Sequence, residues 1–505
     1  MIPNELRVIL VSSWLKAACP VGELYADSRE VRPERESVFF AYEGDTTDGR
    51  LFIEDAIQRG AKTILYEPAN FVWNPEWDEV QHLPVSNLKA LAGPIASAYY
   101  DNPSASFFVV AVTGTNGKTS CTQWLGAALS LLGRKTAVIG TLGAMTFENG
   151  TACDIEQTGY TTPDPVQLQR RLAALCGSGV SCLAIEASSI GIQEGRLNGM
   201  EIDAVLYTNL SRDHLDYHQD MASYAAIKRS LFDFPSVRYA VLNLDDEQGK
   251  AWAAQLKAHI KVTGYTLNNV REEGILVLSA SDVRAQSAET LFSVDSFFGK
   301  NTVQTKTIGH FNTSNLLGVL GILLDYGIPW QKALDILPHL RPPQGRMQQL
   351  GGEGAPLVIV DYAHTPDALE KGLYALKPVA SERKGELWCV FGCGGDRDAG
   401  KRAEMGKAAE IADHVVVTSD NPRTESPAQI MDDIIRGMRR APQCIEDRAS
   451  AISHAIRQAK PNDVIFLAGK GHETVQEIMG VHHPFVDAEH AARALGSLLK
   501  TEEMS

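Results

Sequence analysis

The sequence predicts an α/β protein of three domains. The N-terminal domain is expected to be small and α/β, the central one to hold a parallel sheet with a phosphate-binding loop, and the C-terminal one to be doubly wound and Rossmann-like. Three observations lead to this prediction. The chain has 505 residues, enough for roughly three domains of ~150 residues. Proline-containing joints divide it twice. Short β-branched runs alternate with helical patterns in the middle and last pieces, which is typical of parallel sheets covered on both faces.

The two joints are stiff, turn-forming stretches that suit domain linkers. The first is Asp101-Asn102-Pro103-Ser104, and the second is Arg341-Pro342-Pro343-Gln344-Gly345. They place the predicted domains at residues 1–104, 105–341 and 342–505.

Apolar β-branched runs mark the expected strands. In the middle piece a strand at 107–112 is followed by a helix at 118–132, which Gly133 should end. The other expected strands lie at residues 136–139, 182–187, 204–207, 239–242, 357–360, 387–391, 414–418 and 464–468. Ligands of such sheets bind beyond the carboxyl ends of the strands, so the motifs at those ends are the candidates for function.

Composition excludes several classes of protein. Lys and Arg number 47 against 62 Asp and Glu, and the net charge of −15 argues against a nucleic-acid binder. No apolar run reaches the ~18–20 residues of a membrane span, and the first fifteen residues lack the basic start of a signal peptide. Eight cysteines without a CxxC pattern predict reduced, mostly buried thiols and a cytoplasmic protein, with a zinc site as the alternative; Cys389 and Cys393 lie across a strand and its following loop.

A glycine-rich loop stands between the strand at 107–112 and the helix that follows it. Its residues are Gly114, Thr115, Asn116, Gly117, Lys118, Thr119 and Ser120. Glycines let backbone N–H groups surround a phosphate, Lys118 can reach the outer phosphates of ATP, and Thr119 can ligate Mg²⁺. The general P-loop has a glycine where this chain has Val112. The alternative is a tight glycine-rich turn without a ligand.

Acidic and basic groups follow on later elements. Glu186 ends the strand at 182–187 and is a candidate Mg²⁺ ligand, or else a helix N-cap. His214 lies in a loop dense in polar residues and could ligate a second metal ion, although an isolated loop histidine is usually a surface residue. From its spacing alone, Lys228 would be a surface lysine.

The run T-G-T-N-G-K-T-S at 113–120 resembles the phosphate loop of the Mur ligase superfamily, whose members join an amine to a carboxylate through an acyl phosphate. The resemblance implies that Lys228 is carbamylated by CO₂. It also implies that this carbamate, with Thr119, Glu186 and His214, holds two Mg²⁺ ions. Lys118, Glu186, His214 and Lys228 would then be the catalytic residues.

The resemblance extends to ATP. The segment 309–315 is similar to the family segment that contacts adenosine, through Asn312. Arg346 follows the second joint and could clamp a phosphate as domains close, or else form an interdomain salt bridge. Asp361 and His364 match a segment that lies against the nucleotide.

The last domain carries a second set of matches. Arg397 follows a strand-end glycine loop that lies at the amino-acid acceptor site in the family. The run Asp420, Asn421, Pro422 and Arg423 resembles the signature of family members that add meso-diaminopimelate, and Gly469 and Glu473 complete it. Diaminopimelate is lysine with one more carboxylate, which a guanidinium can bind with two hydrogen bonds. Lysine would leave Arg423 unpaired, and such a site can reject the analogue by ~10⁴-fold.

The first domain resembles the UDP-sugar domain of the family, with Ser28 at the uridine diphosphate. Contacts to the muramoyl peptide are expected from Thr161, Thr162, Ser188, Glu194 and Arg196. The chain departs from the family pattern in having Ile190 in place of a histidine and Glu194 where a glutamine often stands.

Together these matches predict an ATP-dependent ligase that adds meso-diaminopimelate to UDP-N-acetylmuramoyl-L-alanyl-D-glutamate. It would be a cytoplasmic monomer of peptidoglycan synthesis, with small-molecule substrates and no nucleic-acid or membrane partner. One alternative is another ligase of the superfamily, such as a folate polyglutamate ligase. Another is a P-loop ATPase that uses nucleotide only as a conformational switch, and the remaining one is a pure binding module.

Overall fold

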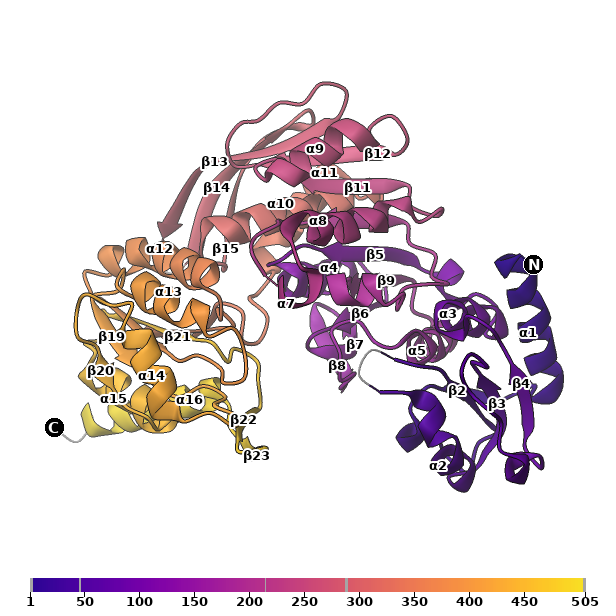
Figure 1. The fold of residues 1–505 in the computed structure, drawn as a ribbon. Helices are drawn as coiled ribbons and strands as arrows, with labels where there is room; N and C mark the ends of the chain where they lie inside the picture. The colour runs from indigo at the N-terminus through magenta and orange to yellow at the C-terminus, as the bar shows by residue number, and fades with distance from the viewer. Residues whose placement is uncertain (1–2, 45–46, 214, 287–288, 503–505) are drawn as a thin grey trace. The chain divides into compact units, whose positions relative to one another are not determined.

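The computed structural model describes residues 3–44, 47–213, 215–286 and 289–502. The chain forms two compact units (Figure 1). One consists of Met1–Leu242 and Asp246–Thr263, and the other of Asn243–Asp245 and Gly264–Ser505.

The first unit begins with a four-stranded, fully parallel sheet in the order β1-β2-β3-β4. Its elements are α1 (Asn4–Ala18), β1 (Glu23–Tyr25), β2 (Ser37–Ala41), α2 (Ile53–Gln58), β3 (Ala61–Tyr66), β4 (Gln81–Pro84) and α3 (Leu88–Tyr99), with 3₁₀ helices at Ser28–Glu30, Gly49–Phe52, Pro75–Trp77 and Pro103–Ser106. Helices α1 and α3 pack on one apolar face of the sheet, and α2 packs on the other. Both faces are therefore covered, as a parallel sheet requires.

The same unit continues with the sheet that carries the glycine-rich loop. Its elements are β5 (Phe108–Thr113), α4 (Lys118–Leu131), β6 (Thr136–Gly140), β7 (Gly143–Glu148), β8 (Thr151–Glu156), α5 (Pro165–Gly177), β9 (Cys182–Glu186), α6 (Ser189–Gln193), β10 (Ala204–Tyr207), α7 (Leu215–His218), α8 (Met221–Ser230), β11 (Tyr239–Asn243), α9 (Glu247–Leu256) and β12 (Lys261–Thr266), with a 3₁₀ helix at Leu231–Asp233. The neighbours run β11-β10-β5-β9-β6-β7-β8.

The expected parallel core of this sheet is present. Strands β11, β10, β5, β9 and β6 pair in parallel, whereas β7 and β8 add an antiparallel edge, so the sheet is mixed. The strands expected from sequence agree with the observed ones to within one residue. Gly133 adopts φ +80° directly after α4, and this left-handed conformation explains the end of the helix.

The second unit opens with an antiparallel ribbon that the sequence did not predict. Its elements are β13 (Leu276–Gln286), β14 (Glu289–Ser296) and β15 (Gly299–Thr305), followed by α10 (His310–Asp325), α11 (Trp330–Ile336) and a 3₁₀ helix at Leu337–His339. Nearly all apolar side chains of helix α10 are buried.

The rest of this unit is a six-stranded sheet in the order β16-β17-β21-β18-β19-β20, parallel except at β16. Its elements are β16 (Gln348–Gly351), β17 (Leu357–Asp361), α12 (Pro366–Glu382), β18 (Leu387–Phe391), α13 (Gly400–Ala409), β19 (His414–Val417), α14 (Pro427–Ile435), β20 (Gln443–Cys444), α15 (Arg448–Gln458), β21 (Val464–Ala468), β22 (Val475–Ile478), β23 (Val481–Pro484) and α16 (Asp487–Glu502).

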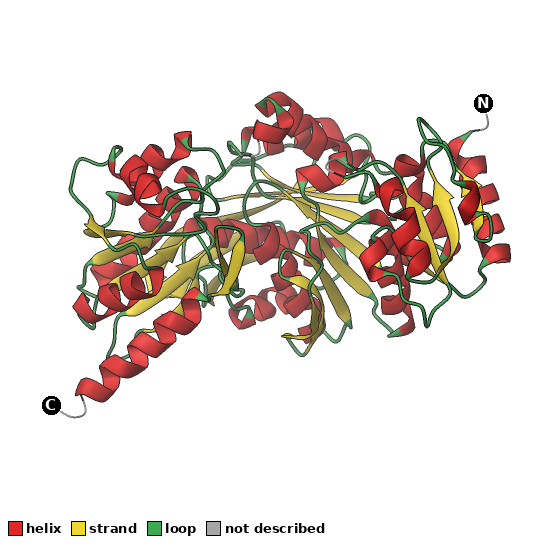
Figure 2. Ribbon diagram, turned by 60° about the horizontal axis from the view of Figure 1, so that its bottom comes forward, coloured by secondary structure: helices red, strands yellow, loops and turns green. Residues whose placement is uncertain are grey.

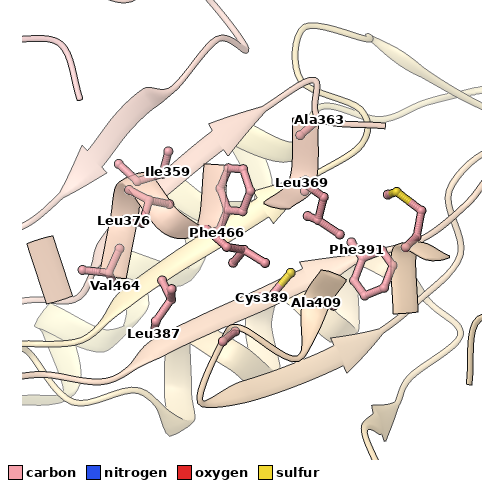
Figure 3. Packing of buried hydrophobic residues seen from close by; sticks show 14 of the residues in the cluster. Ile359, Ala363, Leu369, Leu376, Leu387, Cys389, Phe391, Ala409, Val464 and Phe466 are labelled. Carbon is pink, nitrogen blue, oxygen red and sulfur yellow. The ribbon is translucent and has the colours of Figure 1, made fainter. Parts of the chain in front are cut away.

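Helices cover both faces of this sheet (Figure 2). One core lies beneath α12, α13 and α14, and includes Ile359, Leu376 and Phe466 (Figure 3). A second core lies beneath α15 and α16. The arrangement is the predicted doubly wound domain, and it brings the loops after β17, β18, β19 and β21 to one edge.

All eight cysteines are free thiols, and five of them are buried. In the described part of the chain, no group of three or more His, Cys, Asp or Glu side chains could hold a metal ion, so the cysteines provide no zinc site. None of the helices among the described residues is long and apolar enough to cross a membrane.

Candidate active site

The glycine-rich loop turns from β5 into α4 through two residues in the left-handed region. Gly114 has φ +144° and Gly117 has φ +89°. A Cβ at Gly114 would lie 1.9 Å from the hydroxyl oxygen of Thr208 on the neighbouring strand's loop. Only glycine can therefore stand at Gly114, and its lack of a side chain leaves backbone N–H groups open to an anion.

The loop is held in shape without a ligand. The ammonium of Lys118 donates to the carbonyl oxygens of Gly114, at 2.9 Å, and Thr115, at 2.8 Å. Asn209 accepts from the N–H of Thr115 through its carbonyl and from the N–H of Asn116 through its side chain. Lys118 thus lies folded over the loop, where a phosphate would compete for its donors.

Glu186 lies at the carboxyl end of β9 and is 1% exposed. Its Oε2 accepts from the hydroxyls of Thr119, at 3.2 Å, and Thr141, at 3.1 Å, and its Oε1 accepts from the N–H of Thr141. Ser188, and not Glu186, caps the following helix α6. The N-cap alternative for Glu186 is therefore wrong. The carboxylate of Glu186 instead faces Thr119 at the start of α4.

Lys228 is buried, which overturns the surface position that its spacing alone suggested. The residue is 1% exposed, and its ammonium donates to the carbonyl of Gly114 at 2.9 Å. The ring of Tyr224 lies 4.5 Å from the same nitrogen. Burial, followed by the nearby charge of Lys118, holds the pKa of Lys228 well below its usual range. Helical periodicity missed this because α8 packs this face against the phosphate loop.

The donors near the loop fit a magnesium ion that is bound together with a nucleotide. Glu186 supplies one carboxylate and Thr119 one hydroxyl, and they are already in contact. Mg²⁺ commonly takes one or two carboxylates and completes its shell with phosphate oxygens and water. His214, the other predicted ligand, lies outside the described residues. Asn116 lies in the loop itself, whereas Ser120 is buried in the first turn of α4.

The residues predicted to contact the muramoyl peptide form one hydrogen-bonded group beside Glu186. The hydroxyl of Thr162 donates to the carbonyl of Glu186 and shares a hydrogen bond with Ser188. Thr161 shares a hydrogen bond with Thr141, and Arg196 donates to the carbonyl of Thr162.

Two other predicted residues are placed differently. Both carboxylate oxygens of Glu194 already have partners within the protein. One accepts from the hydroxyl of Tyr217 at 2.6 Å, and the other pairs with Lys89 at 2.7 Å. Ser28 is buried in a 3₁₀ helix of the N-terminal sheet, after Asp27, which caps that helix.

Of the nucleotide residues predicted in the second unit, Arg346 directly follows the second joint and Asp361 contacts Met347 beside it. Asn312 is buried in α10 and donates to the carbonyl of Ile308. The guanidinium of Arg346 lies 4.7 Å from the ring centre of Tyr362. Asp361 accepts from the N–H of Met347, and burial raises the pKa of this carboxyl.

A histidine that the sequence did not single out lies among these residues. His472 is 5.0 Å from Tyr362 between ring centres. Burial, then the charge of Arg346, lowers the pKa of His472 to about 4, so its ring is neutral at physiological pH. His364 is held by a hydrogen bond between its Nδ1 and the carbonyl of Tyr362.

The residues predicted to bind the acceptor amino acid come together after β19 and β21. Asn421 donates to Glu473 at 2.8 Å, and a Cβ at Gly469 would lie 2.5 Å from the carboxylate of Asp420. The guanidinium of Arg423 pairs with Glu477 at 3.1 Å and donates to the carbonyl of Gly395 at 2.7 Å. The expectation that Arg423 lacks a partner without a second carboxylate is therefore wrong. Among the described residues its Nη2 makes no hydrogen bond, and that group remains for a ligand.

Arg397 lies on the exposed loop after β18. Pro422 is buried, and its carbonyl packs against Gly395 of that loop.

Two buried cations that brace these loops were not predicted from the sequence. Lys470 is 0% exposed and bonds Asn421 and Glu473. Arg402 is 2% exposed and pairs with Glu425 and Asp433. No sequence pattern distinguishes such lysines and arginines from surface ones.

Comparison with known proteins agrees with this arrangement. Three family models match: "Mur ligase family, catalytic domain" over residues 21–100, "Mur ligase middle domain" over 112–323, and "Mur ligase, glutamate ligase domain" over 345–471. The chain is 54% identical to the UDP-N-acetylmuramoyl-L-alanyl-D-glutamate--2,6-diaminopimelate ligase of Janthinobacterium sp. (strain Marseille), covering 96% of each chain. It is 48% identical to the enzyme of the same name from Ralstonia nicotianae, covering 98% of this chain and 97% of the relative.

A solved structure of a ligase with this name matches at 35% identity with a TM-score of 0.66, covering 95% of each chain. The family models together span most of the sequence, in the order of its sheets. The chain belongs to the Mur ligase family.

Proposed function

We propose that the protein is an ATP-dependent ligase that adds meso-2,6-diaminopimelate to UDP-N-acetylmuramoyl-L-alanyl-D-glutamate in peptidoglycan synthesis. The observation that carries this proposal is the acceptor cluster of Arg423, Asn421 and Glu473, which offers a guanidinium and a carboxylate on adjacent loops. The names of relatives at 54% and 48% identity support it.

ATP binds to the glycine-rich loop. Backbone N–H groups of the loop and the start of α4 face the phosphates, and Lys118 exchanges its two carbonyl partners for phosphate oxygens. Asn312, Arg346, Asp361 and His364 are assigned to the nucleotide as well. The γ-phosphoryl group passes to the side-chain carboxylate of the D-glutamyl residue, giving an acyl phosphate and ADP.

Thr119, Glu186, His214 and the carbamate of Lys228 would hold Mg²⁺, which when bound would lower the repulsion between the two anions. Carbamylation needs a neutral amine, and burial of Lys228 beside Lys118 favours that form. The neutral amine of Lys228 attacks the carbon of CO₂ and releases one proton to solvent, so that an uncharged side chain becomes an anion next to the phosphate loop.

The amine of diaminopimelate then attacks the acyl phosphate and expels phosphate as the amide forms. Arg423, with Arg397, binds the second carboxylate, and Glu473 binds the ammonium beside it, while Asp420, Asn421, Pro422 and Gly469 shape the loops around them. Exclusion of water protects the acyl phosphate from hydrolysis.

Three domains serve three substrates in this proposal. Residues 1–104, with Ser28, hold the uridine diphosphate, residues 105–341 hold ATP, and residues 342–505 hold the amino acid. Thr161, Thr162, Ser188, Glu194 and Arg196 contact the muramoyl peptide. The protein acts as a cytoplasmic monomer on small molecules.

The test is ADP release with UDP-muramoyl dipeptide and each of several amines. Diaminopimelate-dependent turnover that is absent without an amine supports the proposal. Equal turnover with lysine would reject the assigned acceptor. Turnover that needs no amine would instead support an ATPase that uses nucleotide as a switch.

A further inference from the structure

Lys470 is a fully buried cation in the acceptor cluster. Its side chain is 0% exposed, and its ammonium donates to three acceptors: Oδ1 of Asn421 at 3.0 Å, Oε2 of Glu473 at 2.8 Å and the carbonyl of Val475 at 2.7 Å. An ammonium has three donors, so Lys470 has none left for a substrate. Any effect on the reaction must therefore pass through the groups that it holds.

The principal group that it holds is the carboxylate of Glu473. Both Lys470 and the amide of Asn421 donate to the same oxygen, Oε2, at 2.8 Å each. Within the described chain, Oε1 of Glu473 makes no hydrogen bond, and the side chain is 28% exposed. Two donors on one oxygen fix the rotation of the carboxylate and leave the other oxygen open to solvent and ligand.

The same contacts fix the orientation of Asn421. Its Oδ1 accepts from Lys470 and from the N–H of Glu477 at 3.0 Å, so its NH₂ group can only point toward Glu473. Glu477 in turn pairs with Arg423. Asn421 thus joins two ion pairs, one at the group assigned to the distal ammonium and one at the group assigned to the distal carboxylate.

We infer that Lys470 is a positioning residue that sets the preference for the distal ammonium of the acceptor, by aiming the carboxylate of Glu473. This inference rests on the proposed function. It predicts that loss of Lys470 weakens recognition of that ammonium while recognition of the carboxylates and of ATP is kept. A purely structural ion pair would instead affect all acceptors equally.

The probe that separates these cases is 2-aminopimelate, which keeps both carboxylates of diaminopimelate and lacks the distal amine. We expect Lys470→Met to lower kcat/KM for diaminopimelate by about 10- to 100-fold, the range of one lost charge-assisted hydrogen bond. For 2-aminopimelate the loss should stay below about threefold, and KM for ATP should change by less than about twofold. Lys407→Met, at an exposed position of α13, is the matched control. It should leave kcat/KM for diaminopimelate and for 2-aminopimelate unchanged.

Glu473→Gln and the double variant complete the test. If Lys470 acts through Glu473, adding Lys470→Met to Glu473→Gln should change the diaminopimelate kinetics by less than about threefold. The double variant removes both charges of the pair, so it tests the inference even where Lys470→Met alone fails to fold. An equal loss for both amines, or a further loss of about tenfold in the double variant, would overturn the inference. A wild-type enzyme that does not use diaminopimelate would reject the proposed function as well.

Discussion

The ammonium of Lys228 lies 2.9 Å from the carbonyl oxygen of Gly114, the first glycine of the phosphate loop. Its side chain is buried under the ring of Tyr224, whose hydroxyl shares a hydrogen bond with Thr115 two residues before Gly117. Lysine and loop are therefore parts of one packed structure. A carbamate on Lys228, as proposed above, would therefore form beside the loop that carries Lys118.

Replacing Lys228 tests the role of that amine. Lys228→Met should lower kcat for ADP release by about 10²-fold or more, because the carbamate that would help to hold Mg²⁺ can no longer form. Methionine fills the same apolar path, so the free energy of unfolding should change by less than about 1.5 kcal/mol. Full activity of this variant would exclude carbamylation as a requirement. Mass spectrometry of the wild-type protein under CO₂ should show an added carboxyl on Lys228.

Replacing Glu186 tests the magnesium assignment. Glu186→Gln keeps the shape and loses the charge, so kcat should fall by about 10²–10³-fold and the Mg²⁺ concentration for half-maximal activity should rise. The exposed Glu148, at the end of β7, offers the control Glu148→Gln, which should behave as wild type. An unchanged Mg²⁺ dependence for Glu186→Gln would show that the carboxylate holds only Thr119 and Thr141.

Arg423 should determine selectivity among amines. Arg423→Ala should lower kcat/KM for diaminopimelate by about 10- to 100-fold and narrow its advantage over lysine, because the second carboxylate loses its charged partner. Glu477 and Gly395 already bond this guanidinium, so wild-type rejection of lysine should be weaker than the ~10⁴-fold of a wholly unpaired site. Kinetics with both amines measure this. Unchanged selectivity in the variant would place the recognition of that carboxylate elsewhere.

The buried Arg402 should make stability depend on acid. Hydrogen bonds from Arg402 are the leading cause that lowers the pKa of both Glu425 and Asp433. Such carboxylates bind fewer protons when folded than when unfolded, so they stabilise the protein above their ordinary pKa values near 4 and lose this effect as pH falls below them. The unfolding temperature of the wild type should therefore fall as the pH is lowered from about 5 to 3.

Arg402→Met should lower the unfolding temperature at neutral pH, since it removes the buried guanidinium that pairs with both Glu425 and Asp433. Below about pH 4 its unfolding temperature should approach that of the wild type. Parallel pH curves for the two proteins would contradict this account. Arg436→Met is the control, because Arg436 contacts Asp433 from an exposed position.

Much of the fold followed from local pattern. Buried parallel strands such as Ala204–Tyr207 and Val464–Ala468 are continuous apolar runs, and their bounds were predicted as observed. The ribbon of β13, β14 and β15 was missed because its strands alternate more and less buried residues, and so lack the continuous apolar runs that mark the parallel strands. The antiparallel edge of β7 and β8 was missed although Asn149-Gly150, the turn that joins the two strands, is a typical hairpin signal.

The candidate site was predictable where glycine or strand ends mark it. Gly114 and Glu186 fall at such positions. In the structure Gly114 accepts a hydrogen bond from Lys228, and Glu186 accepts one from Thr119. Burial of lysine and arginine could not be predicted, because a charged side chain on a helix or loop has the same sequence signature whether or not tertiary packing covers it. The partner of Arg423 was likewise invisible, since Glu477 lies 54 residues further along the chain.

The most direct measurement is the mass of the product formed from ATP, UDP-N-acetylmuramoyl-L-alanyl-D-glutamate and meso-diaminopimelate. The account predicts a single product equal to the two joined molecules less one water, formed with one ADP and one phosphate per amide. ATP hydrolysis with both substrates present and no joined product would contradict it.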